Sequence, residues 1–245
     1  MMLNYSYKIL GFVYFLFSYF STSILILIFN QLNIDKARPQ LIRNISSHSR
    51  LAIRILGIKV NVKHFDKLHG KNFLIVSNHL SYMDIFVISS FIPTCFVTSY
   101  EMKETPFLGQ VCTLGGCLFV ERRSKKGIKK EINSLSHSLK KKLNVTIFPE
   151  AKSGSGEGLL KFRSPLYQAA IDSQVDVLPI CINYKKMNGE LVSLKNRDKL
   201  FWYGEMTFFP HFFKLMALKK IEVDLDVLCP ISSTDKVILL NESFE

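Results

Sequence analysis

The sequence contains few of the patterns that form disulfide scaffolds or metal sites. Its 245 residues include five cysteines, and no two of them form a CxxC pair. Four residues separate Cys112 from Cys117, and no second pair of metal ligands accompanies them. The six histidines are scattered, whereas zinc ligands follow characteristic short spacings. We therefore expect reduced thiols, a reducing compartment and no bound metal.

Acidic residues are scarce as well. The chain has 20 Asp and Glu against 32 Lys and Arg, which gives a formal net charge of +12 at pH 7. It contains no recognisable nucleic-acid-binding motif. The chain is also 48% hydrophobic and contains 20 Phe residues. Positive charge combined with high apolar content predicts an anionic membrane surface or an anionic substrate as partner, and no nucleic acid.

Charge is missing altogether between Ile9 and Phe29. About 20 apolar residues suffice to cross the hydrocarbon core of a bilayer. The run is long for a signal peptide and lacks a small-residue cleavage site, although a cleaved signal or a buried core helix are the alternatives. We predict a transmembrane anchor over residues 1–34. Positive charges concentrate after the run, which places the rest of the chain in the cytoplasm; they are Lys36, Arg38, Arg43, Arg50 and Arg54.

Residues 35–57 follow as a predicted amphipathic helix. Leu41, Ile45 and Ala52 fall on one stripe, arginines fall on another, and Gly57 ends the helix. An apolar and basic helix next to a membrane anchor suits the lipid interface. A helix that packs on the domain with its arginines in solvent fits the pattern equally well.

The remaining residues, 58–245, alternate predicted strands and helices without a repeat or a linker, which indicates one α/β domain. Pro179 suggests that its strand is irregular or lies at a sheet edge. The aromatic, nearly uncharged segment 201–218 suits either a second contact with lipid or the core. Predicted strands cover 59–64, 73–77, 95–98, 117–120, 145–148, 175–182 and 221–228, and predicted helices cover 85–91, 125–143 and 163–173.

A polar stretch from Asn78 to Asp84 separates two apolar runs and predicts a corner between a strand and a helix. Two residues five apart on one helix point in different directions, so His79 should precede the helix and Asp84 should lie in its first turn. The carboxylate could then accept a hydrogen bond from one imidazole nitrogen and leave the other as a base. The alternative is an ordinary capping box formed by Ser81 and Asp84.

Four motifs occur in an order that resembles the lysophospholipid and glycerolipid acyltransferases, the PlsC-like family. Asn78-His79-x-Ser81-x-x-Asp84 resembles the NHxSxxD block of that family. The other three motifs are Gly116-x-x-Phe119-x-x-Arg122, similar to GxxFxxR, Phe148-Pro149-Glu150, similar to the start of FPEGTR, and Leu178-Pro179-Ile180, similar to a hydrophobic strand with proline. Together they cover roughly residues 55–230 and are far more specific than a single motif.

This resemblance implies a single glycerolipid-acyltransferase-like domain, with a mixed sheet flanked by helices, behind the membrane anchor. It implies transfer of a fatty acyl chain to a lysolipid hydroxyl from acyl-CoA or acyl carrier protein, which act as co-substrates, so no cofactor is expected. His79 and Asp84 would be catalytic. The substrate-binding residues that the resemblance implies are Asn78, Ser81, Gly116, Phe119, Arg122, Phe148, Pro149, Glu150, Lys152 and Arg163.

The third motif departs from the family after Glu150. Ala151 replaces glycine, Lys152 stands where threonine is usual, and Ser153 occupies the position of the arginine. The serine- and glycine-rich loop up to Gly156 resembles a branch that includes acyltransferases for lyso-ornithine lipid. The expected acceptor is 1-acyl-sn-glycerol-3-phosphate, which would give phosphatidate. Another lysolipid is the alternative acceptor, and a non-catalytic protein that binds membrane surfaces is a minor one.

Overall fold

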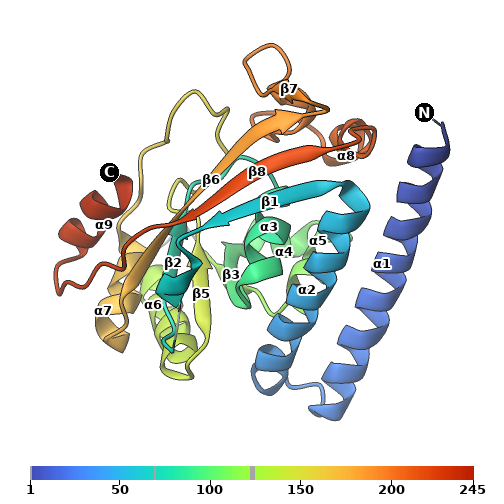
Figure 1. Ribbon diagram of the computed structural model, residues 1–245. Coiled ribbons are helices and arrows are strands. Elements are labelled where there is room, and N and C mark those ends of the chain that lie inside the picture. The colour runs from blue at the N-terminus through green and yellow to red at the C-terminus, as the bar shows by residue number, and fades with distance from the viewer. Residues whose placement is uncertain (1, 69, 122–124) are drawn as a thin grey trace.

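The computed structural model describes residues 2–68, 70–121 and 125–245. It shows helices and strands that alternate along most of the chain (Figure 1). The helices are α1 (Met2–Phe29), α2 (Ile34–Leu56), α3 (Met83–Phe91), α4 (Tyr100–Glu104), α5 (Leu108–Leu114), α6 (Lys125–Lys140), α7 (Gln168–Ser173), α8 (Phe208–Met216) and α9 (Lys236–Phe244), with short 3-10 turns η1 (Phe65–Leu68), η2 (Pro165–Tyr167) and η3 (Arg197–Lys199). The strands are β1 (Ile58–Lys63), β2 (Leu74–Ser77), β3 (Thr94–Ser99), β4 (Leu118–Val120), β5 (Asn144–Ile147), β6 (Val177–Met187), β7 (Glu190–Leu191) and β8 (Ile221–Val227).

All described strands join one mixed sheet in the order β1-β8-β6-β2-β5-β3-β4, and β7 pairs with the end of β6. The strands from β6 to β4 run parallel to one another. β8 is antiparallel to β6, and β1 is parallel to β8. The sheet is therefore mixed, as predicted, because two strands at one side run against the rest.

Helices cover both faces of the sheet, and successive residues of β2 contact different cores. Ile75 packs with Met83 and Ile88 of α3 on one face, together with residues of α8. Leu74 and Val76 pack on the other face with Leu135 of α6 and residues of α7. All four residues of β2 are buried. A strand covered on both faces needs a continuous apolar run, which explains the sequence from Phe73 to Val76.

Two long helices precede the sheet and pack side by side (Figure 1). α1 spans 28 residues, and Tyr5–Phe29 is long and apolar enough to cross a membrane by length and composition. α1 also contacts the domain along its length. Lys8 donates hydrogen bonds to the carbonyl groups of Leu56 and Leu218, and Tyr19 donates one to the carbonyl of Val111 at 2.8 Å.

The second helix, α2, agrees with the predicted range 35–57 to within one residue at each end. It begins at Ile34, because the side chain of Asn33 accepts hydrogen bonds from the N–H groups of Asp35 and Lys36 and caps it. It ends at Gly57, whose φ of 73° is in the left-handed region. A Cβ there would lie 2.3 Å from the carbonyl oxygen of Lys219, so only glycine fits.

Of the two alternatives for the strand that contains Pro179, a position at the edge is wrong, whereas irregularity is present as a register shift between Tyr184 and Lys186. β6 lies between β8 and β2, in the middle of the sheet. The ladder with β8 starts at Ile180, one residue after the proline, and the carbonyl of Pro179 accepts a hydrogen bond from Leu228. The missing proline N–H therefore falls where the β8 ladder has ended, which makes a proline tolerable in an interior strand.

Candidate active site

The predicted corner between strand and helix is present. β2 ends at Ser77, α3 begins at Met83, and Asn78 to Tyr82 form the connection. His79 precedes the helix and Asp84 lies in its first turn, so the two side chains meet. The Nδ1 atom of His79 lies 2.8 Å from Oδ2 of Asp84. The Asp84 side chain is 0% exposed, whereas that of His79 is 18% exposed.

The carboxylate of Asp84 accepts four hydrogen bonds. Oδ2 accepts from His79 Nδ1 at 2.8 Å and from the N–H groups of Leu80 at 2.7 Å and Ser81 at 3.0 Å. Oδ1 accepts from the hydroxyl of Tyr184 at 2.8 Å. Since a carboxylate is an acceptor, Nδ1 of His79 carries the proton and Nε2 presents a lone pair. Within the described residues, no hydrogen bond involves Nε2.

The capping-box interpretation accounts for only part of this arrangement. The N–H of Ser81 does donate to Asp84, as in a capping box. The reciprocal bond is absent, because the N–H of Asp84 donates to the Ser81 carbonyl and the Ser81 hydroxyl accepts a long bond of 3.4 Å from Met83. Asp84 therefore both stabilises the helix start and orients His79.

Asn78 holds the corner to the sheet. Its side-chain amide donates to the carbonyl of Ile182 at 3.0 Å and accepts from the N–H of the same residue at 2.8 Å. This pair of bonds joins the end of β2 to β6. Asn78 and Ile182 are both buried, so the backbone N–H and carbonyl of Ile182 cannot bond to water. The side chain of Asn78 supplies their hydrogen-bond partners instead. Asn78 thereby positions the residue that follows it, His79.

Glu150 supports His79 from the opposite side. Its buried carboxylate accepts hydrogen bonds from the N–H of His79 at 2.7 Å and from the N–H of Leu160 at 2.8 Å. Burial raises the pKa of Glu150, while the two N–H donors oppose that rise. The ring of Phe148 stacks on the imidazole of His79, with 4.1 Å between the ring centres. Residues of the third motif thus hold the backbone and the ring of His79.

The loop 150–156 closes around the same corner. The N–H of Gly154 donates to the carbonyl of His79 at 2.8 Å, and the hydroxyl of Ser153 donates to the carbonyl of Trp202. The N–H of Trp202 in turn donates to the carbonyl of Leu80 at 3.0 Å. Three segments that lie far apart in sequence therefore form one hydrogen-bonded unit around His79.

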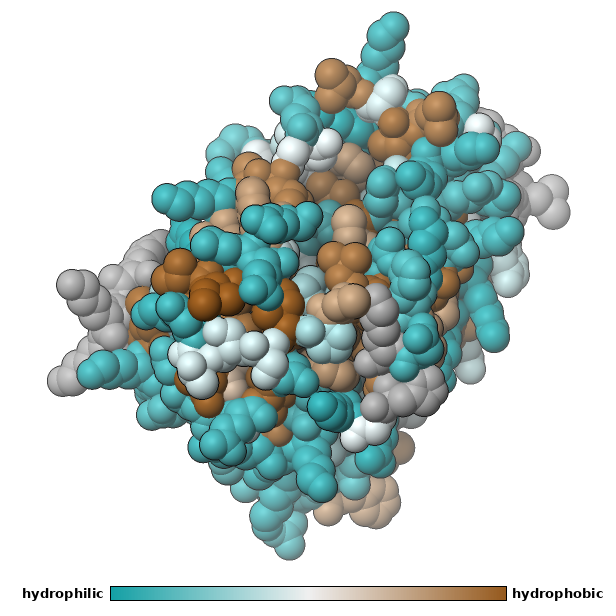
Figure 2. Space-filling model, turned by 60° about the vertical axis from the view of Figure 1, so that its left-hand side comes forward, coloured by the Kyte–Doolittle hydropathy of each residue, from teal (hydrophilic) through white to brown (hydrophobic). Residues whose placement is uncertain are grey.

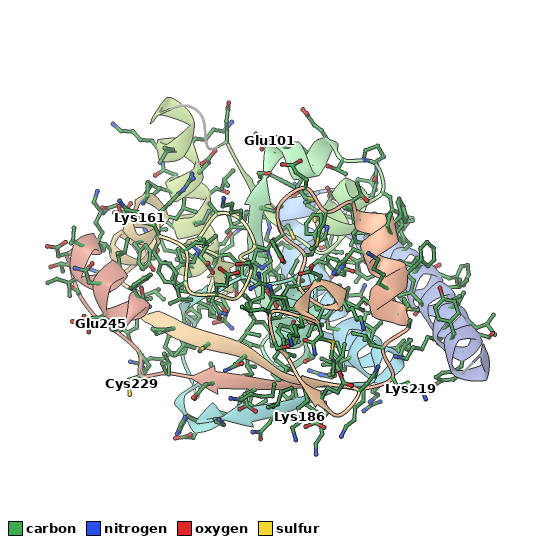
Figure 3. All side chains as sticks on the ribbon, turned by 90° about the horizontal axis from the view of Figure 1, so that it is seen from above. Glu101, Lys161, Lys186, Lys219, Cys229 and Glu245 are labelled. Carbon is green, nitrogen blue, oxygen red and sulfur yellow. The ribbon has the colours of Figure 1, made fainter. Side chains whose placement is uncertain are left out.

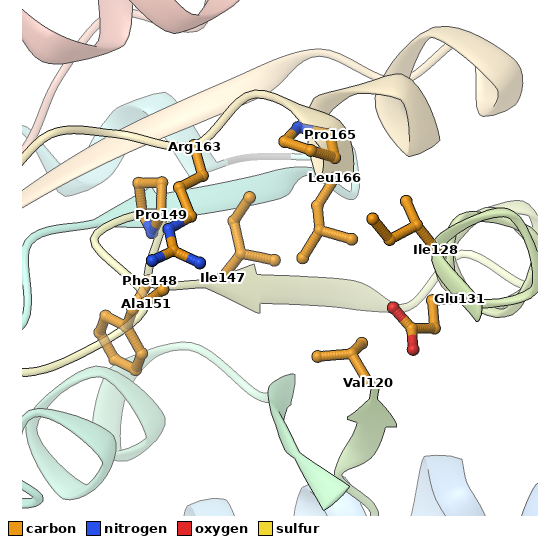
Figure 4. Close-up of a pocket in the computed structure, with 10 residues that line it drawn as sticks. All are labelled: Val120, Ile128, Glu131, Ile147, Phe148, Pro149, Ala151, Arg163, Pro165 and Leu166. Atoms are coloured by element: carbon orange, nitrogen blue, oxygen red, sulfur yellow. The ribbon is translucent and has the colours of Figure 1, made fainter. Parts of the chain in front are cut away.

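Two cavities adjoin this unit. Figure 4 shows the smaller, about 100 Å³, where Arg163 points toward the turn from Phe148 to Ala151. Its walls are mostly apolar and consist of Val120, Ile128, Glu131, Ile147, Phe148, Pro149, Ala151, Arg163, Pro165 and Leu166. The larger, about 550 Å³, carries three cationic side chains; its lining is Glu150, Lys152, Leu160, Lys161, Phe162, Arg163 and Ser164.

Gly116 and Phe119 of the second motif contact the helices α2 and α4. Gly116 has a φ of 74°, and a Cβ there would lie 3.3 Å from the side chain of Arg38 in α2. Its carbonyl accepts a hydrogen bond from Nε of Arg38 at 3.1 Å. Phe119 contacts Tyr100 and Lys103 of α4. The predicted binding residue Arg122 lies outside the described residues.

Tyr184 is the residue of this site that sequence reasoning missed. It lies on β6, a hundred positions after Asp84, and is buried. A tyrosine in a strand is usually a core residue that packs against its neighbours, and none of the four motifs contains Tyr184. Its alternation with Ile182 on the buried face of β6 predicts that it points inward, but not which group it contacts.

Ala151 adopts a φ of 64°, the left-handed region that favours glycine. The resemblance of the third motif implies glycine at this position, which is the residue that this backbone conformation favours. We expect Ala151→Gly to raise the free energy of unfolding by about 0.5–1 kcal/mol, because relief of strain outweighs the added chain entropy. Thermal unfolding measures this. A lower melting temperature would contradict the strain argument and indicate that the methyl group contributes more by lining the smaller cavity.

Among the described residues, no group of three or more His, Cys, Asp and Glu side chains could hold a metal ion.

Comparison with known proteins identifies the family. The Acyltransferase family model matches residues 59–183. The 1-acyl-sn-glycerol-3-phosphate acyltransferase of Neisseria gonorrhoeae is 29% identical over 178 residues, which are 73% of this chain and 68% of that protein. The lyso-ornithine lipid O-acyltransferase of Rhizobium meliloti strain 1021 is 29% identical over 184 residues, which are 72% of this chain and 63% of that protein.

A solved structure matches the whole architecture. It is the crystal structure of the 1-acyl-sn-glycerophosphate acyltransferase PlsC from Thermotoga maritima, with a TM-score of 0.61 and 19% sequence identity. The match covers 96% of this chain and 92% of that one, so the fold extends through α1 and α2. The family membership that the four ordered motifs predict is confirmed: this chain belongs to the acyltransferase family.

Proposed function

We propose that this chain is a membrane-bound O-acyltransferase that moves a fatty acyl chain from acyl-CoA or acyl carrier protein to the hydroxyl of a lysophospholipid. The acceptor that we propose is 1-acyl-sn-glycerol-3-phosphate, and the product is phosphatidate. The observation that carries the proposal is the His79–Asp84 pair, whose histidine is held at its backbone by Glu150, a residue that lines the larger, cationic cavity. The names of the relatives support the reaction class.

The chemistry needs a base, because a lipid hydroxyl is a weak nucleophile at neutral pH. Nε2 of His79 accepts the hydroxyl proton while the oxygen attacks the carbonyl carbon of the thioester. Asp84 holds the ring and stabilises the imidazolium that forms. When the tetrahedral intermediate collapses, the C–S bond breaks and the thiolate takes the proton. The thiolate leaves readily, so no covalent intermediate on the enzyme is required.

The oxyanion of the tetrahedral intermediate needs N–H donors. The N–H groups of the glycine turn at Gly115 and Gly116 already donate to the carbonyl groups of Val111 and Thr113 at the end of α5. The loop 150–156 is the better source. It adjoins His79 through the bond from Gly154, and the N–H groups of Lys152 and Ser153 lie between that bond and Glu150.

The larger cavity suits an anionic head group. Lys152, Lys161 and Arg163 line it, and the carboxylate of Glu150 faces backbone N–H groups rather than solvent. Arg163 is held by its own N–H, which donates to the carbonyl of Pro149 at 3.0 Å. A guanidinium binds phosphate through two parallel hydrogen bonds, whereas a lysine acts as a point charge. We assign Arg163 the main contact and Lys152 a supporting one.

A different lysolipid acceptor is the second candidate. Ala151, Lys152 and Ser153 depart from the family motif, and relatives named lyso-ornithine lipid O-acyltransferase match this chain over similar lengths. Lyso-ornithine lipid carries a carboxylate and an amine in place of phosphate. Lys152 could bind the carboxylate of such a head group, so these two acceptors are compared directly in the test below.

The membrane attachment that we propose rests on α1 and on the distribution of charge. Tyr5–Phe29 is the apolar helix, and only Lys8 precedes its uncharged part closely. Positive charges follow it on α2, and basic residues prefer the cytoplasmic side. We therefore place the domain 58–245 on the cytoplasmic face, where acyl-CoA and acyl carrier protein occur, with residues 1–34 as the anchor and 35–57 at the interface.

The test is an acceptor screen in liposomes with acyl-CoA and, separately, acyl carrier protein as donors. We expect lysophosphatidate to be acylated fastest, and Arg163→Gln to raise its KM at least tenfold, because one charged hydrogen-bond pair is lost. Lys195→Gln, which removes an exposed positive charge away from the cavity lining, is the control. Preference for lyso-ornithine lipid would overturn the assigned acceptor. No turnover with either donor on any acceptor would favour the non-catalytic membrane-binding protein.

Tyr184→Phe should lower the rate of the reaction. Without the hydroxyl, the buried carboxylate of Asp84 loses one of its four hydrogen-bond donors and orients the imidazole of His79 less precisely. We expect kcat/KM to fall about tenfold at pH 7, since a hydrogen bond to a charged group contributes about 1.5–3 kcal/mol.

Thermal unfolding, measured in parallel, separates this effect from a loss of folded protein. Tyr203→Phe is the control, because the hydroxyl of Tyr203 donates to exposed Asp198 instead. A melting temperature that falls while kcat/KM of the folded protein stays within twofold would mean that Tyr184 contributes only to packing.

A further inference from the structure

One helix exposes large aromatic side chains beside the apolar N-terminal helix. On α8, Phe209 is 60% exposed and Phe213 is 51% exposed, and their spacing of four places them on one face. Phe212, Leu215 and Met216 of the same helix are buried and pack into the domain. α8 is therefore anchored by one apolar face while a second apolar face remains uncovered.

This uncovered face continues the apolar surface of α1. The rings of Phe12 and Phe212 lie 4.7 Å apart and join the two helices. Figures 1 and 3 both show α8 beside the N-terminal half of α1. The exposed side chains of α1 there are large and uncharged; they are Tyr7, Leu10, Val13, Tyr14 and Phe17.

Basic side chains border the same face. Lys214 lies next to Phe213 on α8, and Lys219 follows the helix at the same end of the molecule (Figure 3). Aromatic residues with neighbouring lysines are typical of surfaces that lie at the level of lipid head groups. Phenylalanine inserts into the acyl region while the ammonium groups meet anionic phosphates. The residues of this face are therefore better suited to contact with a lipid bilayer than to contact with water.

We propose that the face formed by Phe209 and Phe213 of α8 is a second membrane-contacting surface, continuous with α1, which inserts into the bilayer and holds the active-site corner at the lipid surface. The proposal rests on the membrane attachment proposed above and adds a contact from the catalytic domain itself. Because α1 is already fixed to the domain by the hydrogen bonds of Lys8 and Tyr19, a contact from α8 would enlarge one continuous membrane-facing surface and set the orientation of the domain.

α8 is connected to the active-site corner through Tyr82, the third residue after His79. The hydroxyl of Tyr82 lies 2.9 Å from Nδ1 of His211 on α8, and its ring contacts Phe208. The ring of Tyr82 also contacts Trp202, whose N–H donates to the Leu80 carbonyl. Insertion of α8 would therefore place His79 within a short distance of the bilayer. A lysolipid could then present its hydroxyl with its acyl chain still partly in the membrane.

The opposite side of the molecule has a different surface. Figure 2 shows the side turned away from α1, where hydrophilic side chains predominate. α9 lies on that side (Figure 1), and its Val237 is 52% exposed, which closely matches Phe213. Ile238 and Phe244 of α9 are exposed as well, and some exposed apolar surface is normal for a folded protein. Val237 thus provides a control position with equal exposure but no continuity with α1.

Tryptophan fluorescence with brominated lipids tests the proposal. The chain has one tryptophan, Trp202, so Phe213→Trp and Val237→Trp are each made with Trp202→Phe in the full-length protein. The vesicles contain phosphatidylethanolamine and phosphatidylglycerol with or without bromine on the acyl chains. We expect the bromolipids to quench the Phe213→Trp protein at least twofold and to leave the Val237→Trp protein unchanged.

Two results would overturn the proposal. Unquenched emission at long wavelength from the Phe213→Trp protein would mean that α8 faces water. Unquenched emission at short wavelength would mean that a second copy of the chain covers the face. If the Trp202→Phe protein does not fold, Phe213→Trp and Val237→Trp are compared in proteins that retain Trp202. The emission of Trp202 is then common to both proteins, and the difference between them reports the introduced tryptophan. The measurement needs no turnover, so its failure and that of the acyltransferase assignment are separate results.

Discussion

His79→Ala should abolish acyl transfer almost completely while the protein stays folded. The change removes the base that accepts the hydroxyl proton, and general bases of this kind contribute about 10²–10⁴-fold to the rate. The loss should appear in kcat, because the binding groups of the larger cavity, Lys152 and Arg163, remain in place. Initial rates with both donors, measured at saturating acceptor, give the ratio to the unchanged protein.

The control is His137→Ala, which removes an exposed histidine of α6 and should leave the rate within twofold. The His79→Ala protein also loses the stacking partner of Phe148, so its melting temperature is measured in parallel. A folded His79→Ala protein with more than a tenth of the original kcat would refute the role of His79 as the base.

Asp84→Asn should lower the rate by about 10²–10⁴-fold with little effect on the fold. An amide has the shape of the carboxylate. Its oxygen can accept from the N–H groups of Leu80 and Ser81, and its NH2 group can donate to the hydroxyl of Tyr184, which accepts as well as donates. The substitution therefore removes one negative charge from beside His79 and changes little else. Without that charge, the imidazolium that forms during attack loses its counter-ion.

Two measurements distinguish this explanation from a structural one. Asp84→Ala is expected to unfold more easily than Asp84→Asn, because it leaves the N–H groups of Leu80 and Ser81 without an acceptor in a buried site. Asp198→Asn, at an exposed carboxylate, is the control and should keep full activity. Equal loss of stability in both Asp84 variants would show that the charge itself holds the corner together.

Much of the fold follows from local patterns in the chain. Alternation along Ile221–Val227 predicts a half-covered strand, because side chains of a strand point to opposite faces in turn. The uninterrupted apolar run of β2 predicts an interior strand. The apolar stripe of α6 predicts its helix. The order of the strands in the sheet has no such local signal, and Pro179 pointed to an edge for a strand that lies in the middle.

For the candidate site, spacing alone predicts that Asp84 meets His79, because a corner between strand and helix places residues five apart on the same side. The sequence by itself therefore determined the family, the α/β class, the apolar N-terminal helix and the central pair. Only the tertiary structure decided that Tyr184 contacts Asp84, that Glu150 holds the backbone of His79, that Gly116 packs under α2 and that α8 lies beside α1. The physical reason is range. Periodicity and spacing act within about one element of secondary structure, whereas these contacts join residues that only the packing of the whole sheet and its helices brings together.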